Sequence, residues 1–143
     1  MPFIWDKFYN IGINEIDAQH ESFVNLLNRV SETYENMSNS LGNDEVKMKM
    51  YLDVLNLRKY AFNHFLTEEK YMISSKYQQY FEHKKQHDAF IKKVFELEEA
   101  VINSQEISPQ KLINFMLSWL EGHIQKVDKA FGNYYKAMVG VKS

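Results

Sequence analysis

Apolar side chains recur at intervals of three and four residues along four long segments of the chain, the spacing that places them on one face of a helix. The pattern predicts helices over about 17–37, 44–74, 78–104 and 109–131. A polar run at 38–43 separates the first two segments, and the pair Ser74 and Ser75 separates the next two. Ser108 followed by Pro109 is typical of the cap and first position of a helix.

Four helices of this length joined by short turns are typical of an all-α, up-down-up-down four-helix bundle, and we expect residues 1–143 to form a single domain. Only 2 prolines and 5 glycines interrupt the chain, which favours long helices over an all-β fold. Residues 1–16 are rich in apolar side chains without helical spacing, so we expect an N-terminal arm packed on the bundle. We expect Gly132 to end or weaken the last helix.

The composition excludes several classes of site and partner. The chain has no cysteine, so disulfides, iron–sulfur clusters, thiolate zinc sites and cysteine nucleophiles are excluded. The formal net charge is -2, and no basic patch of the kind that binds nucleic acid stands out. The sequence has neither the pattern of a signal peptide nor the roughly 20 apolar residues that a membrane helix needs, so we expect a cytoplasmic protein.

Histidine stands in the middle of the apolar face of every predicted helix. The chain has 5 histidines, and all lie on these faces: His20, His64, His83, His87 and His123. Glu68 follows His64 by four residues, so the two side chains project from one side of the helix, about 40° and about 6 Å apart. His83 and His87 form a second such pair, and bundles build metal sites from inward pairs on facing helices. A buried carboxylate needs a cation or a donor, and no lysine or arginine falls on these faces near the pairs.

Each of these residues also has a simpler interpretation when it is taken alone. A lone His20 or His123 is typical of a core histidine that fills a polar gap or bonds to the backbone. The two histidines of the third segment lie in a polar run and Glu68 lies in a charge run, both typical of a solvated helix face. The combination favours a metal site, because a metal-free bundle would leave every imidazole in the core without a partner.

Asp128 is a further carboxylate on the last helix, five residues after His123. On a regular helix, positions i and i+5 diverge by about 140°, which would separate the two side chains. A π-helical turn would bring both to one face, and such turns concentrate at functional sites. We therefore predict a local widening of the helix between His123 and Asp128. The alternative is an exposed Asp128 beside two lysines.

The order and spacing of these residues resemble the ligand pattern of the hemerythrin family. The matching motifs are Asp17-Ala18-Gln19-His20, His64-x-x-x-Glu68, His83-x-x-x-His87 and His123-x-x-x-x-Asp128. Trp5-Asp6 near the start, and Trp119-Leu120 ahead of the last histidine, are similar to the bacterial branch of the family. The resemblance covers nearly the whole chain, with no departure at a ligand position.

The resemblance implies two iron ions per chain, bridged by an oxo or hydroxo group, with dioxygen as the ligand. It assigns His83, His87 and His123 to one iron, His20 and His64 to the other, and Glu68 and Asp128 to both as bridges. With the bridging oxygen counted, one coordination position stays open on the iron that has two histidines, where dioxygen would bind. Ligand type alone does not select iron, so manganese or zinc in a recombinant sample stays an alternative.

Apolar side chains within one helical turn of the ligands are candidates for the wall of a ligand pocket. They are Phe23, Val24, Trp119 and Leu120. Such a wall would exclude water and protons and favour reversible release, although plain core packing explains the same residues. No further histidine remains, and we expect no proton donor beyond the ligands themselves.

The function predicted from the resemblance is reversible dioxygen binding for carriage, storage or delivery to an oxygen-using enzyme, without enzymatic activity. Other hypotheses stay open: an oxygen or redox sensor that acts through a signalling partner, a di-iron enzyme such as a peroxidase or nitric oxide reductase, and an iron buffer. A sensor would need a separate partner, because the sequence contains no output domain. An enzyme would need a proton source and would consume dioxygen, so the autoxidation rate distinguishes it from a carrier.

Overall fold

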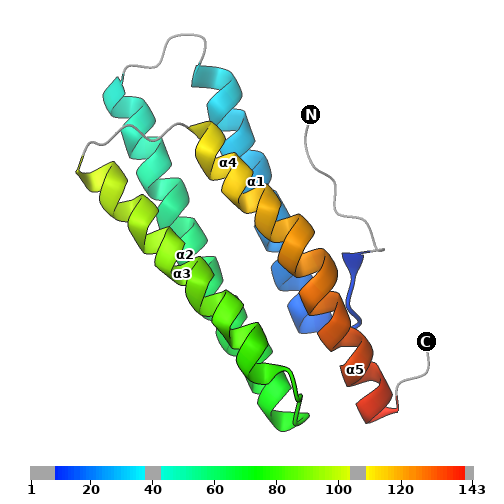
Figure 1. The fold of residues 1–143 in the computed structure, drawn as a ribbon. Coiled ribbons are helices and arrows are strands. Elements are labelled where there is room, and N and C mark those ends of the chain that lie inside the picture. The colour runs from blue at the N-terminus through cyan, green and yellow to red at the C-terminus, as the bar shows by residue number, and fades with distance from the viewer. Residues whose placement is uncertain (1–8, 38–42, 104–108, 141–143) are drawn as a thin grey trace.

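The protein is built from long helices, which a computed structural model describes over residues 9–37, 43–103 and 109–140. The first three helices are α1 (Asn14–Met37), α2 (Asn43–Ser74) and α3 (Tyr80–Ile102). The fourth rod joins α4 (Pro109–Trp119), a π-helix η2 (Leu120–Asp128) and α5 (Lys129–Val139) end to end (Figure 1). The prediction of an all-α fold with four helical rods is confirmed.

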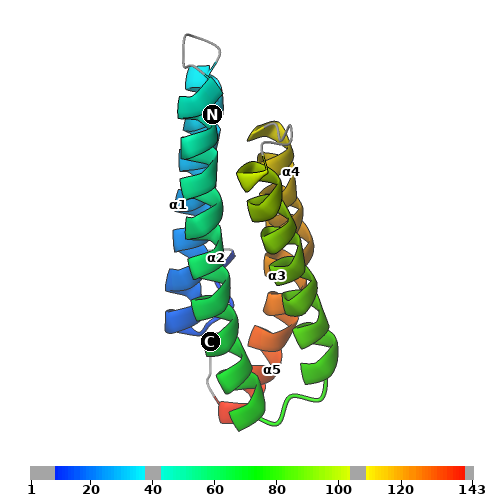
Figure 2. The ribbon, with the colours of Figure 1, turned by 90° about the vertical axis from the view of Figure 1, so that its left-hand side faces the viewer.

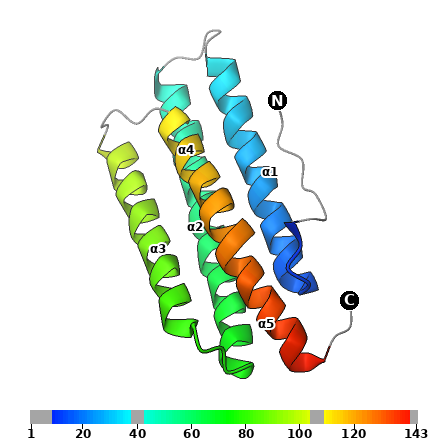
Figure 3. The same ribbon diagram turned by 45° about the vertical axis from the view of Figure 1, so that its right-hand side comes forward.

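The four rods lie side by side, and rods that follow one another along the chain run in opposite directions. α2 contacts α1 and α3, and α4 contacts α1 (Figures 1 and 3). Figure 2 shows α1 with α2 on one side of the bundle and α3 with α4 and α5 on the other. Stacked rings of Phe90 and Phe115, with centroids 4.9 Å apart, join α3 to α4. This is the predicted up-down-up-down topology.

Two apolar clusters fill the bundle at different heights. The larger joins all four rods through buried side chains such as Phe23, Leu57, Phe90 and Met116. The smaller contains Ile11, Ile13, Ile16, Met72 and Phe131. Burial of each such side chain contributes about 1.5–3 kcal/mol, so the clusters hold the rods at a fixed spacing. Along each rod the histidines and carboxylates fall where one cluster gives way to the other, so they form a polar layer with apolar flanks.

Of the two effects predicted for Gly132, ending or weakening the last helix, the first is wrong. α5 continues to Val139, and the left-handed φ of 68° at Gly140 is typical of the residue that ends a helix. Gly132 is buried against Ile11, and a Cβ at position 132 would lie 2.3 Å from the Ile11 carbonyl oxygen. The glycine therefore lets the N-terminal arm pack closely on α5, a long-range contact that helix propensity does not reveal.

The N-terminal arm is shorter than the predicted span 1–16, because α1 already begins at Asn14. The described part of the arm, residues 9–13, packs on the bundle as predicted. The Asp17 carboxylate accepts hydrogen bonds from the backbone N–H groups of Ile11 and the residue after it, at 2.7 and 3.2 Å. These bonds join the arm to the first turn of α1.

Other helix boundaries differ from the prediction by about one turn or less. α3 spans Tyr80–Ile102. It begins later than predicted because the residues just before Tyr80 form the turn that follows α2. Pro109 is the first residue of α4, as predicted, whereas Ser108 and most of the polar run at 38–43 lie outside the described residues. No helix in the described part of the chain is both long and apolar enough to cross a membrane.

Candidate metal centre

Seven ionisable side chains from all four rods meet in one buried layer. They are His20 of α1, His64 and Glu68 of α2, His83 and His87 of α3, and His123 and Asp128 of η2. Each is no more than 2% exposed. Because an uncompensated buried carboxylate costs several kcal/mol, two carboxylates in this layer require positive charge beside them.

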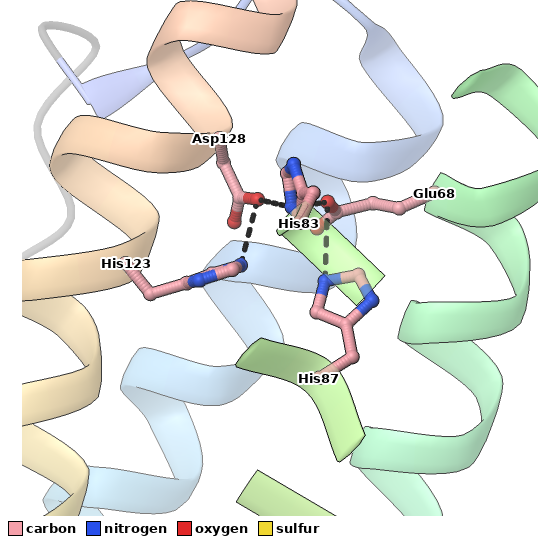
Figure 4. A group of neighbouring side chains, drawn as sticks. All are labelled: Glu68, His83, His87, His123 and Asp128. Atoms are coloured by element: carbon pink, nitrogen blue, oxygen red, sulfur yellow. Dashed lines mark ion pairs between the residues drawn. The ribbon is translucent and has the colours of Figure 1, made fainter. Parts of the chain in front are cut away.

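The donor atoms form two overlapping groups, each compact enough for one metal ion. The first contains Glu68, His83, His87, His123 and Asp128, and the second contains His20, His64, Glu68 and Asp128. Within each group, one donor atom from every residue lies within 4.8 Å of the others. Figure 4 shows the side chains of the first group converging from three rods. The two groups are unequal, because one offers five protein donors and the other four.

The two carboxylates turn one oxygen toward each group. Glu68 Oε2 lies 3.0 Å from His83 Nε2, whereas Glu68 Oε1 faces His64 and lies 3.5 Å from His20 Nε2. Asp128 divides in the same way, with Oδ1 2.8 Å from His83 Nε2 and Oδ2 3.0 Å from His20 Nε2. With one oxygen on each side, each carboxylate would bridge a pair of metal ions held by the two groups.

The π-helix η2 brings Asp128 to the same face as His123. It spans Leu120–Asp128, so the predicted widening of the last helix is confirmed. His123 Nε2 lies 3.0 Å from Asp128 Oδ1 despite the five-residue separation. In a regular α-helix the two side chains would diverge by about 140°, so the wider turn is what completes the first donor group.

The donor atoms are aligned toward a common centre and not toward one another. Although His83 Nε2 is within 3.0 Å of both carboxylates, it forms no aligned hydrogen bond among the described residues. The same holds for both oxygens of Glu68 and of Asp128, and for the Nε2 atoms of His64, His87 and His123. Buried polar atoms are almost always satisfied. Cations held between these atoms would satisfy all of them, so the residues present fit a pair of metal ions.

Three of the imidazoles are oriented from outside the layer by side chains that we did not anticipate. His64 Nδ1 lies 2.7 Å from the amide oxygen of Gln19, and His123 Nδ1 lies 2.7 Å from that of Gln86. His87 Nδ1 lies 3.1 Å from the Glu69 carboxylate. An amide oxygen or carboxylate can only accept, so each Nδ1 donates its proton and leaves the Nε2 lone pair directed at a metal position.

Comparison with known proteins places this arrangement in a family. The family model described as the hemerythrin HHE cation binding domain matches residues 11–135, a span that includes all seven side chains. The chain belongs to the hemerythrin family. The bacteriohemerythrin of Clostridium acetobutylicum is 32% identical over 131 residues, which cover 90% of this chain and 98% of that protein. The bacteriohemerythrin of Stenotrophomonas maltophilia is 30% identical over 135 residues, which cover 94% of this chain and 82% of that protein.

A solved hemerythrin structure shows the same fold. The wild-type protein superimposes with a TM-score of 0.81 at 24% identity, over 94% of this chain and 98% of that chain. Hemerythrins are four-helix bundles, so the likeness agrees with the topology described above.

Protons on the histidines supply the positive charge that metal ions would replace. Burial alone would lower the pKa of His20, but its contacts with Asp128 and Glu68 outweigh burial and raise the pKa to about 9. The same causes raise the pKa of His83 to about 9. Burial disfavours the charged form of both carboxylates, yet the neighbouring imidazoles hold the pKa of each below its usual value. Imidazolium groups therefore balance the carboxylates at neutral pH until a cation displaces their protons.

The residues predicted to line a ligand pocket flank this layer. Phe23, Val24 and Leu120 are buried, and Trp119 is half-buried. The Trp119 ring stacks on His123, with centroids 3.8 Å apart and planes 10° apart. Phe65, which the sequence analysis did not single out, stacks on His87 at 3.9 Å and 4°. These rings fix the imidazole planes and surround the layer with apolar surface.

Tyr60 is a polar group beside the centre that the sequence analysis missed. Its ring stacks on His64, with centroids 5.1 Å apart. Burial, together with the charges of Asp128 and Glu68, raises the pKa of its phenol well above the usual value, and Trp119 partly offsets the rise. A phenol with so high a pKa is a poor acid, so the expectation of no proton donor beyond the ligands is not contradicted. The hydroxyl is a hydrogen-bonding group that this expectation did not include. The signal was present in the sequence, because Tyr60 precedes His64 by four residues and must share its helix face.

Proposed function

We propose that this chain binds dioxygen reversibly at a di-iron centre held by the seven buried side chains. His83, His87 and His123 would hold one iron, His20 and His64 the other, and Glu68 and Asp128 would bridge the two. The observation that carries the proposal is the pair of overlapping donor groups that share both carboxylates. Membership of the hemerythrin family supports iron as the metal and dioxygen as the ligand.

The unequal donor groups support ligand binding at one particular metal. A metal site that binds an external ligand keeps an open coordination position, whereas a purely structural site is closed. The group with four protein donors offers one fewer than its neighbour, so the open position belongs beside His20 and His64. When bound, the two irons supply the electrons that reversible dioxygen binding requires.

The surroundings of the centre support a binding protein rather than an enzyme, used for carriage, storage or delivery of dioxygen. Phe23 and Leu120 are fully buried beside the layer, and the aromatic rings of Phe65 and Trp119 cover two of its imidazoles. Apolar walls exclude water and slow proton delivery, which favours release of an intact ligand over its conversion. The relatives that the chain matches are named hemerythrins and bacteriohemerythrins.

Iron loading followed by cycles of gas exchange tests the proposal. The metal-free chain is loaded with ferrous iron under argon, freed of excess metal, and its iron content and visible spectrum are measured. We expect two irons per chain, one for each donor group. Admission of dioxygen should produce a ligand-to-iron absorption band, and a return to argon should remove it.

The outcomes separate the candidate functions. Recovery of the starting spectrum over many cycles is the result expected of a carrier or store. Net consumption of dioxygen with an oxidised spectrum that argon does not reverse would contradict reversible binding and favour a di-iron enzyme. Iron uptake with no response to dioxygen would leave only an iron store.

A further inference from the structure

Tyr60 places a buried hydroxyl beside the metal centre without a role in holding metal. It lies one helical turn before His64 on α2, and the two rings are nearly parallel, at 17°. On its other side the Tyr60 ring contacts Phe23 of α1, with centroids 5.0 Å apart. Both His64 and the neighbouring His20 belong to the group with four protein donors. The phenol therefore stands on the side of the centre where an external ligand would bind.

The Tyr60 hydroxyl and the Trp119 indole N–H are two neighbouring polar groups without hydrogen-bond partners among the described residues. The two side chains interact across the bundle, from α2 to the end of α4. Both the hydroxyl oxygen and the indole Nε1 atom are buried. An indole N–H can only donate, whereas a hydroxyl can accept one bond and donate another. The hydroxyl proton of Tyr60 is therefore available for a further acceptor.

An unpaired buried hydroxyl is unfavourable for the folded chain alone. Leaving such a group without a partner costs the free energy of its lost hydration, and a phenyl ring of the same shape would avoid that loss. The contacts of Tyr60 with Phe23 and His64 are made by the ring and do not need the oxygen. An acceptor that arrives with a ligand would satisfy the hydroxyl.

We propose that Tyr60 donates a hydrogen bond to a small anionic ligand at the metal position held by His20 and His64. This inference rests on the proposed function, because the ligand needs a loaded centre. It adds a polar contact to a pocket that is otherwise walled by apolar side chains such as Leu120. The pocket then selects ligands whose outer atom carries negative charge over neutral ligands of the same size.

Azide binding to the oxidised, iron-loaded protein tests the inference with Tyr60→Phe as the variant. Azide is a small anion whose binding to ferric iron can be followed by absorbance. The matched control is Tyr71→Phe, which removes a phenol that donates to the Glu15 carboxylate at 2.9 Å and whose ring contacts Tyr135. We expect about tenfold weaker azide binding for Tyr60→Phe, the size typical of a lost hydrogen bond to a charged acceptor. The control should bind azide as the wild type does.

Two further measurements distinguish ligand binding from a structural role. Without azide, Tyr60→Phe should melt at the same temperature as the wild type or a higher one, because the hydroxyl has no hydrogen-bond partner among the described residues and phenylalanine keeps the ring contacts. A lower melting temperature with unchanged azide affinity would show a structural role and overturn the inference. The antisymmetric stretch of bound azide should also shift between H2O and D2O in the wild type, and this shift should disappear in Tyr60→Phe.

Failure of the inference differs from failure of the proposed function. Equal azide affinity in the wild type and Tyr60→Phe, with two irons loaded in each, would overturn the role of Tyr60 and leave dioxygen binding intact. A wild type that takes up no iron would contradict both.

Discussion

At the scale of single residues, Glu68 is the side chain on which both metal positions depend. Its Oε2 atom faces the group of His83, and its Oε1 atom faces the group of His64. Loss of one histidine would remove one donor from one group, whereas loss of Glu68 removes a donor from each. We therefore expect replacement of a bridging carboxylate to reduce metal loading more than replacement of a histidine.

Replacement of this carboxylate is the first prediction. Glu68→Ala should not retain two irons per chain, because both metal positions lose a donor and the negative charge that balances the cations. The measurement is the iron content of the purified variant after removal of unbound metal. Glu82→Ala is the control, since Glu82 lies on the exposed surface of α3 and should load fully. Full loading of Glu68→Ala would remove this residue from the ligand set.

The protonation of the histidines predicts a pH dependence. His20 and His83 have a pKa of about 9, raised from 6.5, and must lose their protons to bind metal. Uptake of ferrous iron at pH 7 should therefore release protons, and the apparent affinity should rise as the pH approaches 9. The sign is opposite for the metal-free protein: the raised pKa values stabilise it below pH 6.5, and that contribution is lost as the pH rises through 9.

An indicator dye in weakly buffered anaerobic solution measures the protons released on addition of iron. Melting curves of the metal-free chain between pH 6.5 and 9 measure the second effect. Iron uptake without proton release, at an affinity independent of pH, would contradict the assignment of these histidines as ligands.

The ligands could be predicted from the sequence, but the residues that orient them could not. Gln19, Glu69 and Gln86 each stand next to a ligand in the sequence. Each contacts a ligand on a different helix, so adjacency along the chain gives no indication of the partner. Their roles follow from side-chain directions across the bundle, which a periodic pattern does not contain.

At the scale of elements, the fourth rod combines a π-helix with a tightly packed glycine. The π-helix could be predicted because two expected ligands were five residues apart, a spacing that a regular helix cannot use. The continuation through Gly132 could not be predicted, because the reason for that glycine is the carbonyl oxygen of Ile11, far away in the sequence. Local patterns predict which segments are helical, and long-range contacts decide where they end.

Two glycine substitutions in this rod should have opposite effects on stability. Gly132→Ala should destabilise the protein by about 1–3 kcal/mol, because its Cβ would lie 2.3 Å from the Ile11 carbonyl oxygen and push the arm away. Gly122→Ala is the matched control, since its Cβ meets nothing within 4 Å and alanine favours a helix. Denaturant unfolding of both variants measures the difference. Equal stability of the two would contradict the close packing of the arm on α5.

At the scale of the whole molecule, the polar layer connects the four rods at the height between the two apolar clusters. Every rod contributes at least one of the seven side chains, so two bound cations would cross-link the entire bundle. We expect the apolar clusters on either side to keep the rods helical in the absence of metal, because each buries large side chains of several rods. Metal should therefore add stability without being needed for the fold.

Removal of metal tests whether metal adds stability without being needed for the fold. Chelation should lower the melting temperature markedly, because a ligand that binds only the folded state stabilises it in proportion to the logarithm of its concentration over its Kd. The helical circular dichroism signal at room temperature should stay nearly unchanged. A chain that unfolds completely on chelation would show that the apolar clusters are insufficient, and unchanged melting would show that the layer binds no metal.

The most direct test of the account is anomalous diffraction at the iron edge from crystals of the iron-loaded protein. The account predicts two iron peaks between the carboxylates of Glu68 and Asp128. One peak should contact three histidines and the other should contact only His20 and His64, with a coordination position left for an external ligand. A single peak, or two peaks with equal and complete sets of protein donors, would contradict it.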